Sequence, residues 1–184
     1  MGNPAHGHID DPVICFSRTA AVLTVSDRGA KGEREDLSGR LLRERLSAEG
    51  YQVEHYGVVA DERQEIEEAL RRLADNSETA LIVTTGGTGV APRDVTPEAT
   101  LSVIERLVPG MAEAMRHASL AKTPHAMISR GVVGIRGRSL IVNLPGSPGG
   151  AMENFEVILP ALPHALKKIQ GDPSDCVVQS QYPP

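Results

Sequence analysis

A short glycine-rich segment follows an apolar run near the middle of the chain. The run Ala80–Thr84 has the length and the β-branched content of a buried strand, and directly after it stand Thr85, Gly86, Gly87, Thr88 and Gly89. Glycines at such a place let the backbone turn its N–H groups toward a phosphate, because no Cβ obstructs the approach. The segment lacks the Gly-Lys-Ser/Thr of a Walker A loop and the third glycine of a dinucleotide fingerprint. It predicts either an anion cradle or a tight turn that needs small residues.

Two aspartates stand close to predicted helix starts. Asp94 lies two residues before Thr96 and Pro97, which predict a helix with Thr96 as its N-cap. Asp94 is then free for another role, either as a ligand of a divalent metal beside bound phosphates or as the residue that closes an Asx-turn. Asp61 begins an Asp-x-x-Gln pattern that ends at Gln64, which is typical of a capping box. A carboxylate has two oxygens, so a capping Asp61 could also bind a metal.

Two further pairs of residues also follow predicted strands. The runs 20–25 and 139–144 end at these pairs, which are Ser26 with Asp27 and Pro145 with Gly146. In open parallel sheets, ligands bind outside the carboxyl ends of the strands. We therefore expect both pairs to lie on the same rim as the glycine segment and Asp61, although all are far apart in sequence.

The elements that must position these residues alternate along the chain. Strands are predicted at 20–25, 51–59, 80–84 and within 127–144, and helices at 37–49, after 61, at 96–107, at 111–121 and at 152–169, the last split at Pro160. This alternation predicts a single α/β domain with a mostly parallel sheet covered by helices on both faces. We place the domain at residues 20–171, between flexible tails at 1–19 and 172–184.

The amino-acid composition argues against several classes of binding partner. The 184 residues include 19 Lys and Arg against 24 Asp and Glu, a formal net charge of −5, whereas a general nucleic-acid binder presents a basic surface. Aromatic residues make up 3%, which is too few for a base-stacking platform. The two cysteines show no metal-ligand spacing, and no apolar run reaches the roughly 20 residues of a membrane span. We expect a cytoplasmic protein that binds neither nucleic acid nor membrane, while a small anionic ligand stays compatible.

Three motifs give the sequence a resemblance to a known family. They are Thr84–Gly89 (TTGGTG), Arg93–Ala99 (RDVTPEA) and Asn143–Pro148 (NLPGSP), with support from Val25–Arg28, Ala126–Arg130 and Ile158–His164. Together they resemble the molybdopterin-binding family of molybdenum cofactor biosynthesis. The similarity covers about residues 20–171, which is nearly all of the predicted domain.

The resemblance implies a three-layer α/β sandwich, usually assembled as a homotrimer. It implies that the segment Gly86–Gly89, Pro145 and Gly146 line the molybdopterin side, with Ser129 nearby. Ser26, Asp27 and the loop that follows them as far as Gly39 would face a nucleotide. The two acidic positions tied to catalysis in the family match Asp61 and Asp94, which would also hold Mg²⁺.

The reaction implied by the resemblance is transfer of AMP from MgATP to molybdopterin, with release of pyrophosphate. Within the same family, the alternative is a carrier or scaffold that binds molybdopterin without transferring AMP. A molybdenum insertase is a further partner that the resemblance suggests.

Overall fold

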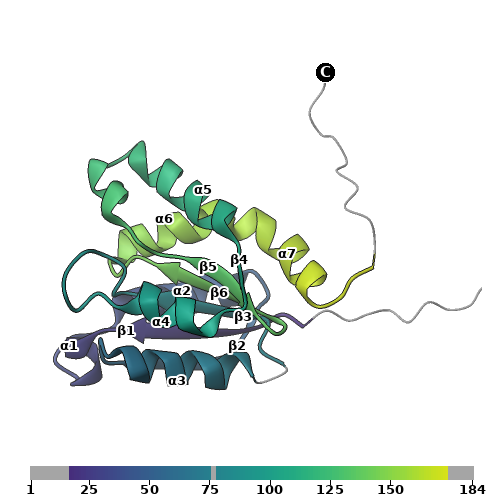
Figure 1. Ribbon diagram of the computed structural model, residues 1–184, viewed down its shortest axis with the longest axis horizontal. Coiled ribbons are helices and arrows are strands. Elements are labelled where there is room, and N and C mark those ends of the chain that lie inside the picture. The colour runs from purple at the N-terminus through teal and green to yellow at the C-terminus, as the bar shows by residue number, and fades with distance from the viewer. Residues whose placement is uncertain (1–16, 76–77, 174–184) are drawn as a thin grey trace, which may run out of the picture.

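A six-stranded sheet forms the centre of the molecule, with strand order β2-β1-β3-β6-β5-β4. The computed structural model describes residues 17–75 and 78–173 (Figure 1). The strands are β1 (Thr19–Val25), β2 (Gln52–Val59), β3 (Leu81–Thr85), β4 (Arg106–Leu107), β5 (Val133–Arg136) and β6 (Ser139–Leu144). The strands β2, β1, β3 and β6 are parallel, whereas β5 and β4 continue the sheet in antiparallel fashion. The predicted mostly parallel α/β sheet is confirmed.

Helices cover both faces of this sheet. They are α1 (Asp27–Ala30), α2 (Leu37–Ala48), α3 (Arg63–Ala74), α4 (Thr96–Val103), α5 (Pro109–Leu120), α6 (Pro148–Ile158) and α7 (Leu162–Ile169), with 3-10 turns η1 (Pro124–Ile128) and η2 (Leu159–Ala161). In Figure 1, α3 and α4 lie on one side of the sheet, and α5, α6 and α7 on the other. The predicted split of the last helix at Pro160 is confirmed, since η2 separates α6 from α7.

Two hydrophobic cores follow from the alternation of side chains along the strands. In β1, Ala20 and Val22 pack into the core with α2, α5, α6 and α7, whereas Ala21 and Leu23 pack into the core with α3 and α4. Phe155 of α6 is the largest fully buried side chain. A sheet buried on both faces makes the strand ends a rigid base for the loops that follow them.

Some predicted boundaries need correction. The strand β1 begins at Thr19, one residue before the predicted start of the domain, and both predicted tails lie almost wholly outside the described residues. The helix predicted at 96–107 ends at Val103, because Ile104 turns extended and Arg106–Leu107 pair with β5. In the described part of the chain, no helix is long and apolar enough to span a membrane.

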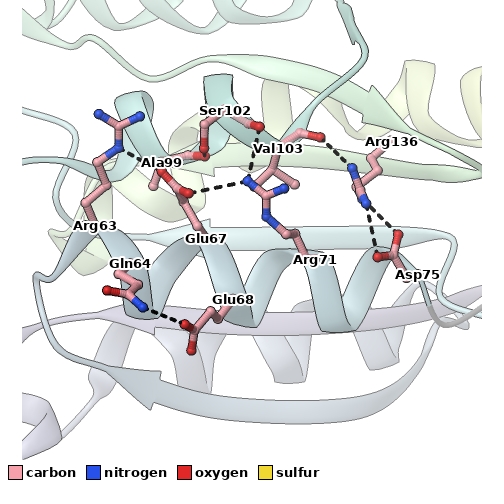
Figure 2. A network of polar contacts seen from close by, with 10 residues as sticks. All are labelled: Arg63, Gln64, Glu67, Glu68, Arg71, Asp75, Ala99, Ser102, Val103 and Arg136. Atoms are coloured by element: carbon pink, nitrogen blue, oxygen red, sulfur yellow. Dashed lines mark hydrogen bonds and ion pairs between the residues drawn. The ribbon is translucent and has the colours of Figure 1, made fainter.

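A polar network joins α3 to α4 along the outer surface (Figure 2). Glu67 of α3 accepts hydrogen bonds from Arg63 (2.7 Å) and Arg71 (3.3 Å), and Arg71 also donates to the carbonyl of Ser102 in α4 (3.3 Å). Exposed ion pairs each contribute little to stability. Their placement is informative here, because the network links α3, which follows Asp61, to α4, which follows Asp94.

Candidate active site

The glycine segment turns sharply at the end of β3. Gly86 and Gly87 have φ angles of +107° and +63°, which L side chains rarely adopt. A Cβ on Gly86 would lie 2.2 Å from the carbonyl oxygen of Val25. The tight turn that the sequence predicted is therefore present, and it brings the segment between the ends of β1 and β6.

The Pro145-Gly146 pair lies against this turn. The Thr85 hydroxyl donates a hydrogen bond to the carbonyl of Pro145 (2.6 Å), and a Cβ on Gly146 would lie 3.2 Å from the Cα of Gly86. From the other side, the Ser38 hydroxyl donates to the carbonyl of Gly146 (2.8 Å). The ends of β3 and β6 thus meet at one place, as the strand-end rule predicted, and the start of α2 joins them there.

Thr96 has a different role from the predicted N-cap. It is the first residue of α4, whose N-cap Val95 makes no side-chain capping bond. The fully buried Thr96 hydroxyl instead donates to the carbonyl of Gly86 (2.9 Å), and its N–H donates to the carbonyl of Gly87 (3.1 Å). The prediction was wrong because the carbonyl of Gly86 needs a buried donor, and the hydroxyl of the buried Thr96 supplies it.

Asp61 also does not form the predicted capping box. Its Oδ2 accepts the N–H of Asp27 (2.7 Å), and the Oδ1 of Asp27 accepts the N–H of Asp61 (3.1 Å). Gln64 donates to Glu68 (3.0 Å) and not toward the helix start, where Glu62 is the N-cap without a side-chain bond. This reciprocal pairing locks the segment after β2 to the segment after β1.

Arg93 neutralises one member of this pair. Its guanidinium contacts both carboxylate oxygens of Asp27 at 2.8 to 3.1 Å and also contacts Glu62 (2.7 Å). The hydrogen bond from Arg93 holds the pKa of Asp27 below its ordinary value. Burial raises the pKa of Asp61, and the negative charges of Asp27 and Asp94 act in the same direction. Arg93 and the N–H of Asp27 offset these effects only in part, so the pKa of Asp61 stays above its ordinary value.

Asp94 closes the loop that follows the glycine segment. Its Oδ2 accepts the N–H of Ala91 (2.8 Å), and a Cβ on Gly89 would lie 2.8 Å from the same oxygen. Asp94 therefore closes this loop, as the Asx-turn alternative suggested. The hydrogen bond is not that of an Asx-turn, however, because its donor, the N–H of Ala91, lies three residues before Asp94. Among the described residues, no hydrogen bond to the Oδ1 atoms of Asp61 and Asp94 is formed, so each acid keeps one oxygen for a ligand.

A cavity of about 400 Å³ opens on one side of the glycine segment. Its lining includes Asp94 and Ser129, together with Gly87, Thr88, Gly89, Pro145 and Gly146. Arg116 and Asn154 from α5 and α6 form its far wall. The lining brings together the residues that were predicted for the molybdopterin side except Gly86, which lines the second cavity instead.

A second cavity, of about 320 Å³, lies on the other side. Its lining includes Ser26, Asp61, Thr85, Gly86 and Gly87. Gly87, Gly146 and Ser147 border both cavities, so the two are separated only by this ridge. Asp27 lines neither cavity, and it reaches the second one only through its bonds with Asp61.

Two helices begin at this ridge: α2, whose start lies in the loop predicted to face a nucleotide, and α6, whose start was given no role as a helix end. Asp36 caps α2 by accepting the N–H of Gly39 (2.8 Å), and Ser147 caps α6 by accepting the N–H of Gly150 (3.3 Å). The N-terminal ends of helices carry partial positive charge, which favours anions. A cap residue followed by a helical apolar stripe is the signal in the sequence that could have found both.

The comparisons with known proteins agree with this arrangement. The model of a family described as "Probable molybdopterin binding domain" matches residues 21–164. The chain belongs to the molybdopterin-binding family. The match includes the glycine segment, both acids and the Pro145-Gly146 pair.

This chain is similar in sequence or structure to several known proteins. It is 47% identical over 155 residues to the molybdopterin adenylyltransferase of Helicobacter pylori J99, covering 82% of this chain and 87% of that protein. It is 40% identical over 171 residues to gephyrin of Dictyostelium discoideum, covering 86% of this chain but 23% of gephyrin. Among solved structures, the molybdopterin biosynthesis enzyme MoaB of Thermus thermophilus superposes with a TM-score of 0.79 at 51% identity, covering 88% of this chain and all of that one.

The described residues contain no group of three or more His, Cys, Asp and Glu side chains arranged to hold a metal ion. Two carboxylates are nonetheless a normal protein contribution to a Mg²⁺ site, since this ion usually keeps waters and binds substrate phosphates as well. The free Oδ1 atoms of Asp61 and Asp94 and the raised pKa of Asp61, which a bound cation would lower, fit that use.

Proposed function

We propose that this member of the family transfers AMP from MgATP to molybdopterin, giving adenylylated molybdopterin and pyrophosphate. The observation that carries the proposal is the pair of adjoining cavities, which meet at Gly87, Gly146 and Ser147, with Asp94 in the lining of one and Asp61 in the lining of the other. A reaction between two phosphate-bearing substrates needs such a shared border, because the attacking phosphate oxygen must come into contact with the phosphorus atom that it attacks. The name of the Helicobacter relative, molybdopterin adenylyltransferase, supports the same reaction.

The two cavities take different substrates in this proposal. Molybdopterin occupies the cavity with Ser129 and Asp94, and its phosphate lies against the glycine segment. ATP occupies the cavity with Ser26 and Asp61, and its α-phosphate lies at the ridge. The N–H groups that begin α2 and α6 then face the phosphates from two directions, which offsets part of their charge.

In the reaction, the terminal phosphate oxygen of molybdopterin attacks the α-phosphorus of ATP. One P–O bond forms, and the bond to the departing pyrophosphate breaks. Such a step depends on alignment and charge stabilisation and needs no covalent protein intermediate. Asp61 and Asp94 would hold Mg²⁺, which supplies charge neutralisation for the phosphates when bound. The reciprocal bonds with Asp27 keep Asp61 oriented toward the ridge.

The decisive experiment mixes purified protein with MgATP and molybdopterin and measures both products. We expect pyrophosphate and adenylylated molybdopterin in equal amounts. An ATP analogue with a methylene group between the α- and β-phosphorus should bind but release no pyrophosphate. Tight binding of molybdopterin without any pyrophosphate from ATP would overturn the proposal in favour of the carrier alternative.

The resemblance also leads us to propose a homotrimer, a cytoplasmic location and a molybdenum insertase as partner. The lack of any cysteine pair with disulfide or metal spacing supports a reducing compartment. Light scattering at micromolar concentration tests the trimer, and a purely monomeric protein would count against it. Pull-down of an insertase with purified components tests the partner.

A further inference from the structure

Arg130 contacts both ends of the loop between the glycine segment and α4. Its N–H donates to the carbonyl of Thr88 (2.9 Å), and its Nε donates to the carbonyl of Gly89 (2.5 Å). Its Nη2 donates to the carbonyl of Asp94. One residue thus fixes the start and the end of the loop that carries Asp94, and it does so from the segment next to Ser129.

The guanidinium of Arg130 also forms an ion pair. Nη1 of Arg130 binds Oε1 of Glu98 in the first turn of α4. The side chain of Arg130 is 37% exposed and that of Glu98 41% exposed, so the net stability from the pair itself is small. The planar guanidinium can serve three acceptors at once, whereas a lysine ammonium is a point charge on a flexible stem. This geometry requires arginine.

The fixed loop determines where the Asp94 carboxylate lies. Oδ2 of Asp94 accepts the N–H of Ala91 inside this loop, and Gly89 approaches the same oxygen closely. If the carbonyls of Gly89 and Asp94 lose their common donor, the backbone on both sides of the carboxylate can move. We propose that Arg130 is a positioning residue that holds Asp94 in place for adenylyl transfer, and this inference rests on the proposed function.

Arg130→Met and Arg130→Lys test the inference, with Arg136→Met as the matched control. Arg136 makes the same kinds of contact, to both carboxylate oxygens of Asp75 and to the carbonyl of Val103, but none to the site (Figure 2). Since misplacing a group by about 1 Å can cost roughly 100-fold in rate, we expect kcat to fall roughly 100-fold in Arg130→Met. The KM for molybdopterin should rise much less than kcat falls, because Arg130 itself does not line its cavity and most of the lining lies outside residues 88–95. Arg130→Lys should recover only a small part of kcat, and Arg136→Met should keep all of it.

Amide hydrogen exchange supplies a readout that does not depend on activity. In Arg130→Met, residues 88–95 should exchange faster while the helices and strands keep their protection. Glu98→Gln should leave both exchange and kcat nearly unchanged, because the carbonyl contacts of Arg130 remain. Unchanged exchange of residues 88–95, or an unchanged kcat in both Arg130 variants, would overturn the inference. If the wild-type protein transfers no AMP, the proposed function fails, while the exchange experiment still decides whether Arg130 fixes the loop.

Discussion

Replacement of Asp61 by Asn separates catalysis from stability. The amide keeps the shape of the side chain and can still accept the N–H of Asp27 through its oxygen, but it removes the negative charge. If Asp61 were only a structural residue, this substitution would be nearly silent. If Asp61 binds Mg²⁺ and the ATP phosphates, activity must fall while the fold persists.

The contacts of Asp61 give the expected size of both effects. A hydrogen bond to a charged group contributes about 1.5–3 kcal/mol and one between neutral groups about 0.5–1.5 kcal/mol, so the bond to Asp27 weakens by about 1 kcal/mol. The substitution also removes the cost of keeping a half-buried carboxylate charged, since burial raises the pKa of Asp61, and this offsets part of the lost hydrogen-bond energy. The melting temperature should therefore change by less than about 4 °C. A bound metal contributes several kcal/mol to phosphoryl transfer, so a loss of about 3 kcal/mol lowers kcat roughly 100-fold.

The pH dependence of stability provides a second signature. The raised pKa of Asp61 means that its ionisation costs the folded state more than the unfolded state. The wild-type protein therefore loses stability from this group as pH rises from its ordinary pKa of about 3.8 through the raised value, whereas Asp61→Asn does not. The difference in melting temperature, variant minus wild type, should increase over that interval.

Pyrophosphate release and thermal melting should be measured side by side. Asp75→Asn is the matched control, because Asp75 is an ion-paired carboxylate at the other end of α3. It should keep normal turnover. Near-normal kcat in Asp61→Asn would remove Asp61 from the catalytic machinery, and lost turnover together with a melting temperature lowered by much more than about 4 °C would make it a structural residue.

Two other substitutions test the loop and the turn. Gly89→Ala should lower kcat with little change in melting temperature, because the new Cβ would lie 2.8 Å from Oδ2 of Asp94 and must displace that partly exposed carboxylate. Normal kinetics in this variant would show that the position of Asp94 is not critical. Thr96→Val should destabilise the protein by about 1–3 kcal/mol, since the carbonyl of Gly86 loses its buried donor, and denaturant unfolding measures this directly. A change of less than about 0.5 kcal/mol would show that another group satisfies that carbonyl.

The arrangement of the site was predictable from the sequence where it depends on strand ends. Buried parallel strands are visible as short apolar runs, and the rule that ligands bind beyond their carboxyl ends placed Ser26, Asp61, Gly86 and Pro145 on one rim. The glycine segment indicated a backbone conformation that other residues rarely adopt, and two of its residues do have positive φ angles. The antiparallel β4 was missed because a strand of two exposed residues carries no periodic signal.

Hydrogen-bond partners were not predictable in the same way. The local pattern at Asp61 and Gln64 favours a capping box, yet Asp61 binds the N–H of Asp27, which lies 34 positions earlier. Likewise, Thr96 has the local features of an N-cap but donates to Gly86, ten positions earlier. Propensities describe neighbours along the chain, whereas these side chains respond to groups that only the folded sheet brings near.

The charges around the second cavity lead to a final prediction about metal removal. Its lining contains three acids, Glu35, Asp36 and Asp61, and one cationic side chain, Arg34. Asp36 is held by Thr24 and Tyr56, and Glu35 pairs with Arg40, so Asp61 is the acid left to face a nucleotide. A polyphosphate entering such a cavity meets repulsion that the helix starts offset only in part.

We therefore expect ATP to bind poorly without a divalent cation. Two like charges about 4 Å apart repel each other by about 4 kcal/mol at the effective dielectric constant of a protein surface. Screening by salt and the partial positive charge of the helix starts reduce this repulsion. We expect a remaining penalty of about 1.4 kcal/mol, which lowers the affinity for ATP roughly tenfold. Calorimetric titration with ATP in EDTA and in excess Mg²⁺ measures this directly. Asp61→Asn should lose most of the difference, because it removes the charge that makes the cation necessary. Equal ATP affinity in EDTA and in Mg²⁺ for the wild-type protein would mean that Asp61 does not act through a metal, and that the helix starts and Arg34 suffice to hold the phosphates.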